Sequence, residues 1–489
     1  MGYIEGVDRH QRTLFPEALD DYVAADSTVR VIDEFVGGLD LVTYGFTRAI
    51  PAAEGRPGYD PRALLSLYIY GYLNRTRSSR RLEAETHRNL EVIWLMRKLR
   101  PDHKTIAEFR REHVKELKLV AREFFLVCKE LKLLDSTLML IDGSKIRAVN
   151  SRERNYTEGR VAKLLQRVDR SIAKYLADLD QQDRREEGTG GPTDPDLQQK
   201  LEALRARQQE LRKYQKQIRQ TGTQVSLTDP ESRRMKVRGD QDVCYNAQIA
   251  VDPKHHLIVA HDVTNEVTDI EQLAPMALAA KQELGVEHLE VAADGGYHNG
   301  SQVVTCEQNG ITVYVPVTKT SKNEKAGLFT KEDFTYSEER DAYRCPAGHW
   351  LQRRTQAKTN SGRVLGYYMN VQACRTCPLR AHCTKNKYAR RIMRTPEEAQ
   401  VEAMRKRLAE RPELMVQRKS AVEHPFGTMK RGWDADHFLL KGLEGVRGEF
   451  SLSVLAYNLR RAINILGVEC LLETLRSRKM AAKGALGPA

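Results

Sequence analysis

The chain lacks the features that mark membrane and secreted proteins. No apolar run approaches the roughly 20 residues that a transmembrane helix needs. The first five residues show neither the basic segment nor the apolar segment of a signal peptide. Eight cysteines among 489 residues do not make a disulfide scaffold. We therefore expect a cytoplasmic protein in which clustered cysteines bind metal and scattered cysteines pack in the core.

Also absent is a Gly-x4-Gly-Lys-Ser/Thr loop, so no nucleotide cofactor is expected. Acidic residues are outnumbered, since 79 Lys and Arg against 66 Asp and Glu give a net charge of +13. This excess favours a polyanionic partner, most commonly nucleic acid, although a merely basic soluble protein is the alternative. Hydrophobic residues make up 40% of the chain, enough for a folded core, and the length predicts about two to four domains.

Residues 1–135 have the pattern of several short helices. Asp60 is placed as an N-cap, and Pro61 opens a helix that extends to about residue 73. Basic residues follow at the joints between the expected helices, at Arg75, Arg77, Arg80 and Arg81. This arrangement is typical of a helix-turn-helix DNA-binding region. The alternative is an ordinary helical domain whose arginines are solvated.

The following segments alternate between strands and helices. Residues 138–148 are expected to form a buried strand whose apolar run ends in Asp142, and residues 288–297 are expected to form a strand that leads through Asp294 into a glycine loop. Further strands are predicted at 243–251, 257–263 and 311–317, and a helix at 271–284. Residues 157–220 interrupt this order with two amphipathic helices, which predicts an antiparallel helical hairpin. The whole order fits a mixed α/β sheet with an insertion.

Three acidic residues are candidates for catalysis. Asp142 and Asp294 each end a predicted strand and precede glycine, and strand ends are where active-site groups collect. Two nearby carboxylates suit Mg²⁺, and two such ions serve phosphoryl transfer. A strand-end Asp more often caps a turn, which is the alternative. The third acid, Glu423, stands in a basic segment and could instead be a surface ion pair.

The basic segment around Glu423 would suit a site that holds a phosphodiester. If it is helical, Lys419, Glu423 and Lys430 share one face, although Pro425 could kink the turn. Trp433 could stack on an unpaired base, with a core or lid aromatic as the alternative. The DNA contacts expected in this segment are Arg418, Lys419, Lys430, Arg431 and Trp433.

Residues 318–395 read as irregular, polar and cysteine-bearing. Cys374 and Cys377 form a Cys-x2-Cys pair, and Cys345 and Cys383 can complete four thiolates around a structural Zn²⁺. His349 and His382 are reserve ligands, and free loop thiols are the alternative. The remaining cysteines stand singly in apolar contexts and are expected in the core: Cys128, Cys244, Cys306 and Cys470.

Together these blocks resemble insertion-sequence transposases of the DDE class, in the IS-four-like superfamily and within it the IS-eleven-eighty-two type. The blocks are residues 59–111, Leu-Ile-Asp-Gly-Ser at 140–144, Tyr-Asn-Ala-Gln-Ile-Ala-Val-Asp at 245–252, Ala-Asp-Gly-Gly-Tyr at 293–297 and Val-Glu-His-Pro-Phe-Gly-Thr-Met-Lys at 422–430. The resemblance implies a ribonuclease-H-like catalytic core in which Asp142, Asp294 and Glu423 bind metal and Lys430 contacts DNA phosphate. The family's Tyr-Arg-Glu-Lys signature is only partly matched. Lys419 stands where its Arg is expected, with Arg418 adjacent, and its Tyr is missing.

The resemblance also divides the chain into segments. They are a helical DNA-binding domain (1–135), the first part of the core (136–156), a helical-hairpin insertion (157–225), the continuing core (226–317), a cysteine-rich zinc-binding insertion (318–395), a helical part of the core that carries the catalytic Glu (396–475) and a disordered tail (476–489).

The activity that the resemblance implies is DNA transposition. Hydrolysis at the element's end frees a 3′-hydroxyl, which then attacks target DNA, and two Mg²⁺ or Mn²⁺ ions neutralise the charge at phosphorus. The implied partners are the terminal inverted repeats, target DNA and a second copy of the chain, at the bacterial nucleoid. Two alternatives stay open: a DNA-binding regulator with an inactive nuclease, and a metal-dependent nuclease without strand transfer.

Overall fold

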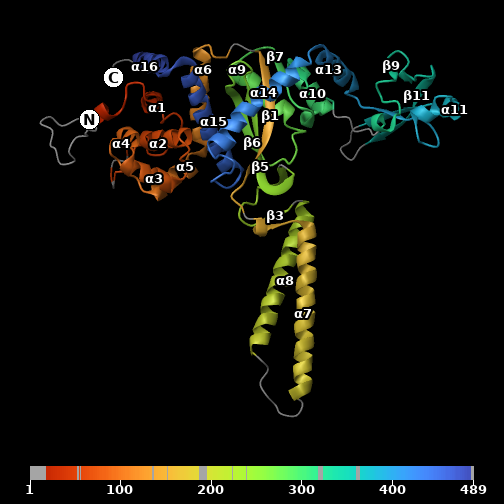
Figure 1. Ribbon diagram of the computed structural model, residues 1–489, viewed down its shortest axis with the longest axis horizontal. Helices are drawn as coiled ribbons and strands as arrows, with labels where there is room; N and C mark the ends of the chain where they lie inside the picture. The colour runs from red at the N-terminus through yellow and green to blue at the C-terminus, as the bar shows by residue number, and fades with distance from the viewer. Residues whose placement is uncertain are drawn as a thin grey trace, which may run out of the picture. The chain divides into compact units, whose positions relative to one another are not determined.

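A computed structural model describes residues 18–51, 54, 57–134, 137–150, 152–186, 195–222, 224–237, 239–317, 323–358 and 364–485 (Figure 1). They belong to two compact units. The first unit comprises Met1–Asp135, Gly143–Val267 and Glu423–Ala489, and the second comprises Ser136–Asp142 and Thr268–Val422. Within the described residues, no helix is long and apolar enough to cross a membrane.

The first unit contains helices from both ends of the chain. The N-terminal helices are α1 (Thr28–Gly37), α2 (Pro61–Leu73), α3 (Ser79–Arg88), α4 (Leu90–Leu95), α5 (His103–Glu112) and α6 (Val114–Glu130). Helix α2 begins as predicted, because the Asp60 side chain accepts a hydrogen bond from the Arg62 N–H at 2.8 Å.

The C-terminal helix α15 (Leu443–Leu466) forms the centre of this unit. Both α2 and α6 pack against it, and α1 packs against α16 (Val468–Ala485). A Cβ at Gly448 would lie 2.5 Å from the Val114 carbonyl oxygen, so glycine lets α15 approach the start of α6. The N-terminal helices thus pack with the C-terminal helices within one compact unit.

The predicted disordered tail from residue 476 is wrong as far as Ala485, because α16 continues to that residue. Leu475 is buried, and the basic side chains that follow pair with acids of α1 and α6. Arg478 contacts Glu123 at 2.8 Å, and Lys479 contacts Glu34 at 2.9 Å. These partners lie more than 350 residues earlier in the chain, so the local sequence did not reveal them. Residues 486–489 lie outside the described residues.

The two long helices α7 (Glu158–Glu186) and α8 (Pro195–Thr221) lie side by side (Figure 1). The start of α7 packs against the end of α8, so the helices run antiparallel. Their shared core contains Tyr156, Val161, Leu211, Ile218 and Val225. Short strands β2 (Asn155–Tyr156) and β3 (Val225–Ser226) pair antiparallel at the base of the helices.

The main sheet has the strand order β4-β5-β1-β7-β8, with β6 also paired to β5. In the first unit, β4 (Arg233–Val237), β5 (Asp240–Val251) and β6 (Ile258–Thr264) pair antiparallel. In the second unit, the first half of β1 (Leu138–Arg147) pairs parallel with β7 (Leu289–Ala292), which pairs parallel with β8 (Ile311–Tyr314). This is a mixed sheet in an α/β fold, as the sequence predicted.

The second unit also contains helices outside its cysteine-rich segment. They are α9 (Leu273–Leu284), α10 (Gly300–Gln308), α13 (Glu398–Glu410) and α14 (Glu413–Gly427). Helix α10 packs against β8, α9 and α13, and α13 also packs against β8. Helix α14 is the longest of this group and extends through Pro425 into a π-helical turn, η5 (Thr428–Gly432).

The cysteine-rich segment is not irregular, which corrects the expectation from sequence. Five strands form an antiparallel sheet in the order β13-β12-β11-β10-β9. They are β9 (Thr335–Ser337), β10 (Ala342–Arg344), β11 (Trp350–Lys358), β12 (Val364–Met369) and β13 (Ile392–Arg394), joined by the short helices α11 (Val371–Arg375) and α12 (Arg380–Cys383). The buried core is small: Phe334, Tyr343, Leu351, Tyr368 and Ile392. Strands this short, with arginines among the apolar residues, give little period-two signal.

Candidate active site and cysteine cluster

The register of β1 and β7 brings Asp142 and Asp294 to neighbouring strand ends. Leu140 lies opposite Ala292 in the parallel pair, and each aspartate follows two residues later. Adjacent strands are about 4.8 Å apart, so the two aspartates follow the strands at one edge of the sheet. Asp294 also caps a turn, because one of its carboxylate oxygens accepts a hydrogen bond from the Gly296 N–H at 2.8 Å. One oxygen of Asp294 thus caps the turn, while its second oxygen lies near another side chain, and the catalytic role of Asp294 stays a prediction.

That side chain is Arg418 of α14, which both aspartates share. Its guanidinium donates to the Asp142 carboxylate and lies 3.6 Å from Asp294 Oδ2. Nε and Nη2 also donate to the Ile141 carbonyl oxygen, at 3.1 and 3.0 Å. Arg418 is buried, with 8% of its surface exposed, so the expected DNA contact at this residue is wrong. A buried cation beside two carboxylates offsets their mutual repulsion.

Tyr297 interacts electrostatically with the two aspartates and was not singled out from the sequence. Its side chain is fully buried. Burial raises the pKa of its hydroxyl well above the usual value, and the charges of Asp269, Asp142 and Asp294 raise it further. The hydroxyl therefore stays protonated. The only signal for it was its place directly after the two glycines at 295–296.

Glu423 is exposed on α14, one helical turn after the exposed Lys419. The next residue, His424, is within 2.8 Å of the Tyr457 hydroxyl, which donates to the His256 carbonyl oxygen at 2.9 Å. These contacts fix the end of the helix. The structure joins Asp142, Asp294 and Arg418 within the second unit, whereas Glu423 begins the last segment of the first unit. Its place in a triad stays a prediction.

Lys430 lies against the strand segment that follows Asp142. Its ammonium group donates to Ser144 Oγ at 2.8 Å and to the Lys145 carbonyl oxygen at 2.5 Å. Lys430 stands in the π-helical turn η5, so Glu423 and Lys430 do not keep the α-helical phase that the sequence assumed. Arg431 is exposed.

Trp433 is a core residue in this structure, which contradicts its expected role in base stacking. Only 7% of its surface is exposed. Its ring lies edge-on to Tyr457, with ring centroids 6.5 Å apart. The alternative of a core aromatic is therefore the correct one for this conformation.

The four arginines at 75–81 divide into two kinds. Arg75, Arg80 and Arg81 are exposed, as a DNA contact requires. Arg77 is buried, with an ion pair to the buried Glu449 at 3.5 Å. It also donates to the backbone carbonyl oxygens of His437, at 2.9 Å, and Asp434. The expected DNA contact at Arg77 is therefore wrong.

Another group of potential metal ligands was not predicted. Ligand atoms of Asp434, Asp436 and His437 all lie within 4.8 Å of one another, which among the described residues is true of no other group of three. Arg147 pairs with Asp436 and already supplies a positive charge there. The group therefore has its own counter-charge, and we assign it no metal.

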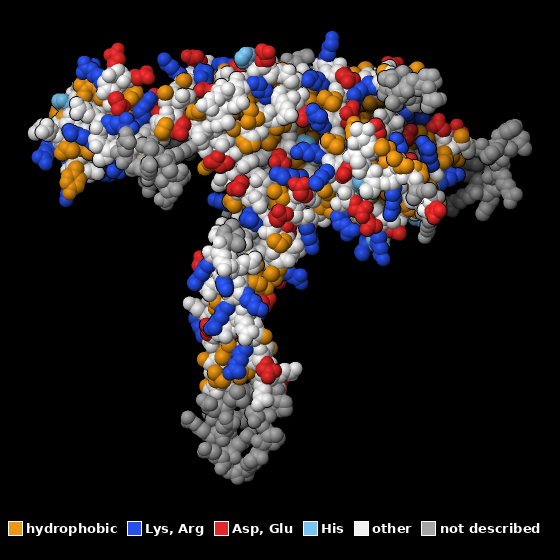
Figure 2. Space-filling view, turned by 180° about the vertical axis from the view of Figure 1, so that it is seen from behind, with side chains coloured by type: hydrophobic (Ala, Val, Ile, Leu, Met, Phe, Trp, Pro, Cys, Tyr) orange, Lys and Arg blue, Asp and Glu red, His pale blue; other side chains and the backbone are white. Residues whose placement is uncertain are grey.

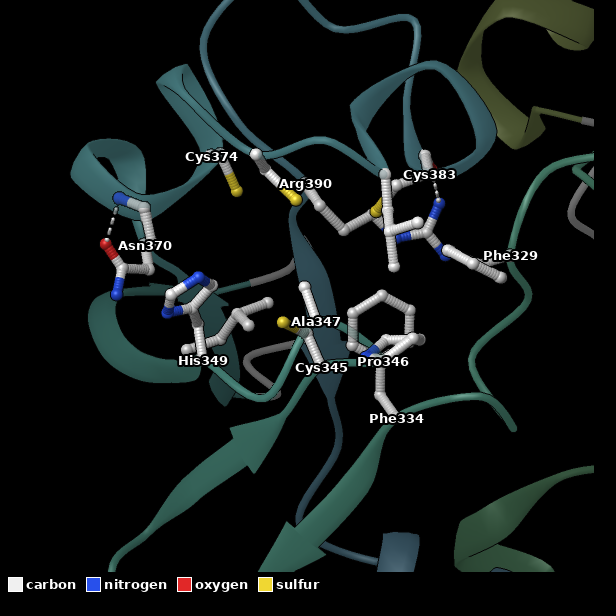
Figure 3. A pocket seen from close by; sticks show the side chains of 14 residues that line it. Phe329, Phe334, Cys345, Pro346, Ala347, His349, Asn370, Cys374, Cys383 and Arg390 are labelled. Atoms are coloured by element: carbon white, nitrogen blue, oxygen red, sulfur yellow. Dashed lines mark hydrogen bonds between the residues drawn. The ribbon is translucent and has the colours of Figure 1, made fainter.

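The four clustered cysteines line one pocket of the second unit, together with His349. Figure 3 shows Cys345, Cys374 and Cys383 approaching this pocket from different segments. Burial raises the pKa of the Cys383 thiol, Arg390 lowers it, and the other three cysteines raise it. Among the described residues, these sulfur atoms are not within 4.8 Å of one another as a set. A loaded zinc site would bring them closer, since each Zn–S bond is about 2.3 Å.

The scattered cysteines follow the prediction with one exception. Cys128, Cys244 and Cys306 are buried, and burial raises the pKa of each thiol to about 12. Cys470 is exposed, so its expected place in the core is wrong. It stands in the first turn of α16, on the side away from the buried Leu471.

Two family models match the chain. Residues 344–463 match a transposase DDE domain, and residues 17–112 match a transposase domain (DUF772). No curated protein and no solved structure matches it. Both matched domains are those of transposases, a class of proteins that bind DNA and generally use divalent metal ions. The two matches support the resemblance to DDE-class insertion-sequence transposases that the sequence predicted.

Proposed function

We propose that the chain cuts the ends of its insertion sequence and joins them to target DNA, with Asp142, Asp294 and Glu423 as the acidic triad. The observation that supports this most is the pair of aspartates that follow neighbouring parallel strands and share Arg418. The match to the DDE domain, which covers Glu423, supports it as well. A ribonuclease-H-like core and the IS-eleven-eighty-two type are parts of the same proposal.

The donor atoms fit two Mg²⁺ or Mn²⁺ ions. Carboxylate oxygens are the ligands that these hard cations prefer. The Asp142 and Asp294 side chains keep 21% and 50% of their surface exposed, so ions can reach them from solvent. Two bound ions would offset the charge that develops on the phosphorus and hold the attacking and leaving oxygens.

The protein's own cations have separate tasks in this proposal. Arg418 is a positioning residue: its bonds to the Ile141 carbonyl anchor it while it holds Asp142 and Asp294 close together. Lys430, anchored at Ser144 and Lys145, would bring positive charge to the phosphate that is cut. Lys419 and Arg431, both exposed, would contact the adjoining phosphates.

We also propose that Cys345, Cys374, Cys377 and Cys383 hold one structural Zn²⁺. Four thiols that line one pocket are a donor set typical of structural zinc. The main hydrophobic cluster described in this subdomain has five buried residues, so a bound ion would add stability to a small core. His349 lines the same pocket and is the reserve ligand, whereas His382 does not line it.

Recognition of the element's ends is assigned to the N-terminal helices, through Arg75, Arg80 and Arg81. Helix α3, which carries the last two of these residues, follows α2 after a short turn, as in DNA-binding helix pairs. The working complex would be a homodimer that brings two element ends together.

The test is a two-stage DNA assay with purified protein. A supercoiled plasmid that carries the element's ends should be nicked with Mg²⁺ or Mn²⁺, and a plasmid without ends should stay intact. Pre-cut ends should then join to target DNA. Binding without nicking would assign the regulator alternative, and nicking without joining would assign a plain nuclease; either result contradicts the proposal.

A further inference from the structure

The positive charge of this chain is concentrated in one segment. Residues 342–394 contain 12 Lys and Arg and no Asp or Glu, while the whole chain has a net charge of +13. About a tenth of the chain therefore accounts for nearly all of its excess charge. Four thiolates with one zinc ion would lower this charge by only two. On the surfaces of soluble proteins, acidic and basic side chains are usually interspersed. Solubility alone therefore does not explain a segment with basic residues and no acidic ones.

Some of these cations are used inside the subdomain. Arg380 donates to the carbonyl oxygens of Cys374, Asn386 and Lys387, and Arg390 donates to the Cys383 carbonyl oxygen. Arg394 pairs with Glu402, outside the segment. Others are exposed and have no ion pair among the described residues: Arg344, Arg354, Arg375, Lys385, Lys387 and Arg391.

The five-stranded sheet has one buried face and one open face. Cross-strand partners share a face, so the register defines the open face by three linked pairs. They are Arg344 with Trp350, Gln352 with Met369, and Tyr367 with Met393. Arg344, Gln352 and Met393 are exposed. The buried face carries the small core around Tyr343 and Leu351.

Aromatic side chains hold further cations on the open face. The Arg391 guanidinium lies 4.7 Å from the centre of the Tyr367 ring, and the Arg340 guanidinium lies 4.9 Å from that of Trp350. Such stacking fixes the guanidinium plane and leaves its N–H groups available for an anion. A β-bulge between Arg353 and Thr355 places Arg354 as the extra residue of β11. On the side of the molecule drawn in Figure 2, Lys and Arg side chains lie beside exposed hydrophobic ones on this subdomain.

We propose that this subdomain is a DNA-binding module whose open sheet face contacts the phosphate backbone of duplex DNA; over residues 335–394, with β9 included, it has 13 Lys and Arg against three Asp and Glu. Unpaired cations at this density repel one another, and a polyanion with regularly spaced phosphates relieves that repulsion. Arginine suits phosphate through paired N–H donors. The assignment goes beyond the proposed function, in which this segment has only a structural role.

The test measures equilibrium binding of the full-length protein to a labelled DNA duplex of unrelated sequence, without added Mg²⁺. The variant carries Arg344→Ala, Arg354→Ala and Arg391→Ala, none of which belongs to the proposed catalytic site. Each lost phosphate contact lowers the slope of log K against log salt by about 0.9. Between roughly 50 and 200 mM salt, wild-type affinity should therefore fall about 40-fold more than that of the variant.

Matched variants separate this face from general charge and from misfolding. Arg212→Ala with Lys213→Ala and Lys216→Ala removes the same charge from exposed positions of α8 and should leave the slope unchanged. Replacing the three face arginines by lysine should keep most of the slope, because the charge remains. If the triple alanine variant does not fold, as judged by its thermal melt, the single Arg344→Gln variant should still lower the slope by about 0.9.

An unchanged affinity and slope in the folded triple alanine variant would overturn the proposal, as would an equal loss in the α8 variant. A loss confined to an RNA duplex would assign the face to RNA and also overturn it. Because no cleavage is measured, failure here is distinct from failure of the catalytic proposal.

Discussion

Replacement of Arg77 by methionine tests whether this arginine belongs to the core or to the DNA-contact surface. Arg77 is 7% exposed and its partner Glu449 is 1% exposed, with 3.5 Å between their charged atoms. Removing one partner of a buried pair typically costs about 3–5 kcal/mol, because the other charge stays buried. Glu449 also accepts hydrogen bonds from the Leu439 and Leu440 N–H groups at 2.8 Å, and these bonds would partly stabilise its buried negative charge after Arg77 is removed. We therefore expect the low end of that range, about 3 kcal/mol.

The assay is urea unfolding of the full-length protein, with Arg75→Met as the matched control. Arg75 is exposed, and surface substitutions usually change stability by less than about 0.5 kcal/mol. Combining Arg77→Met with Glu449→Leu should recover much of the loss, because neither charge then remains buried alone. If Arg77→Met is as stable as wild type but binds element ends more weakly with a flatter salt dependence, Arg77 is a DNA contact and this reasoning is refuted.

Three further outcomes are expected. Arg418→Met should lower the free energy of unfolding of the metal-free protein by about 2 kcal/mol in thermal melts, and added Mn²⁺ should stabilise this variant more than it stabilises wild type. An unchanged melting temperature and an unchanged Mn²⁺ effect would show that Arg418 does not position the two aspartates. Elemental analysis should find about one Zn²⁺ per chain, lost on Cys374→Ser or Cys377→Ser, whereas a metal-free but folded and active protein would make the cysteines loop thiols. The triple variant with Arg75→Ala, Arg80→Ala and Arg81→Ala should bind element ends more weakly, and its slope of log K against log salt should fall by up to about 3. If it binds the ends as tightly as wild type, these arginines do not recognise the ends, and the α7–α8 hairpin is the next region to test.

The strand ends could be predicted because their signal is local. A run of apolar residues followed by Asp and Gly marks both Asp142 and Asp294, and the Asp60-Pro61 pair marks the start of α2. Each of these patterns depends on residues within a single element. Hydrophobic periodicity and capping chemistry are therefore enough to find them.

Burial of the arginines could not be predicted, because the partners are remote in sequence. Glu449 is 372 residues from Arg77, and Asp142 is 276 residues from Arg418. Nothing near either arginine distinguishes it from an exposed neighbour such as Arg75 or Lys419. Only the tertiary packing of α15 and α14 decides which cation is buried.

The small five-stranded sheet was missed for a different reason. Three of its five strands have only three residues each, and arginines occupy positions where apolar residues would mark a strand. Arg394 is an example, because its guanidinium stacks on Tyr336 at 3.6 Å instead of facing solvent. The side chains of such a sheet pack through cation–aromatic contacts, which a hydrophobic pattern does not record.

The most direct test of the catalytic account is cleavage by three single variants on DNA that carries the element's ends. Asp142→Asn, Asp294→Asn and Glu423→Gln keep the shape of each side chain and remove its charge, so each should abolish metal-dependent cleavage while end binding stays near wild type. Glu423 is the decisive member, because the register of β1 and β7 supports only the two aspartates. Full cleavage by Glu423→Gln, with both aspartate variants inactive, would contradict the proposed triad.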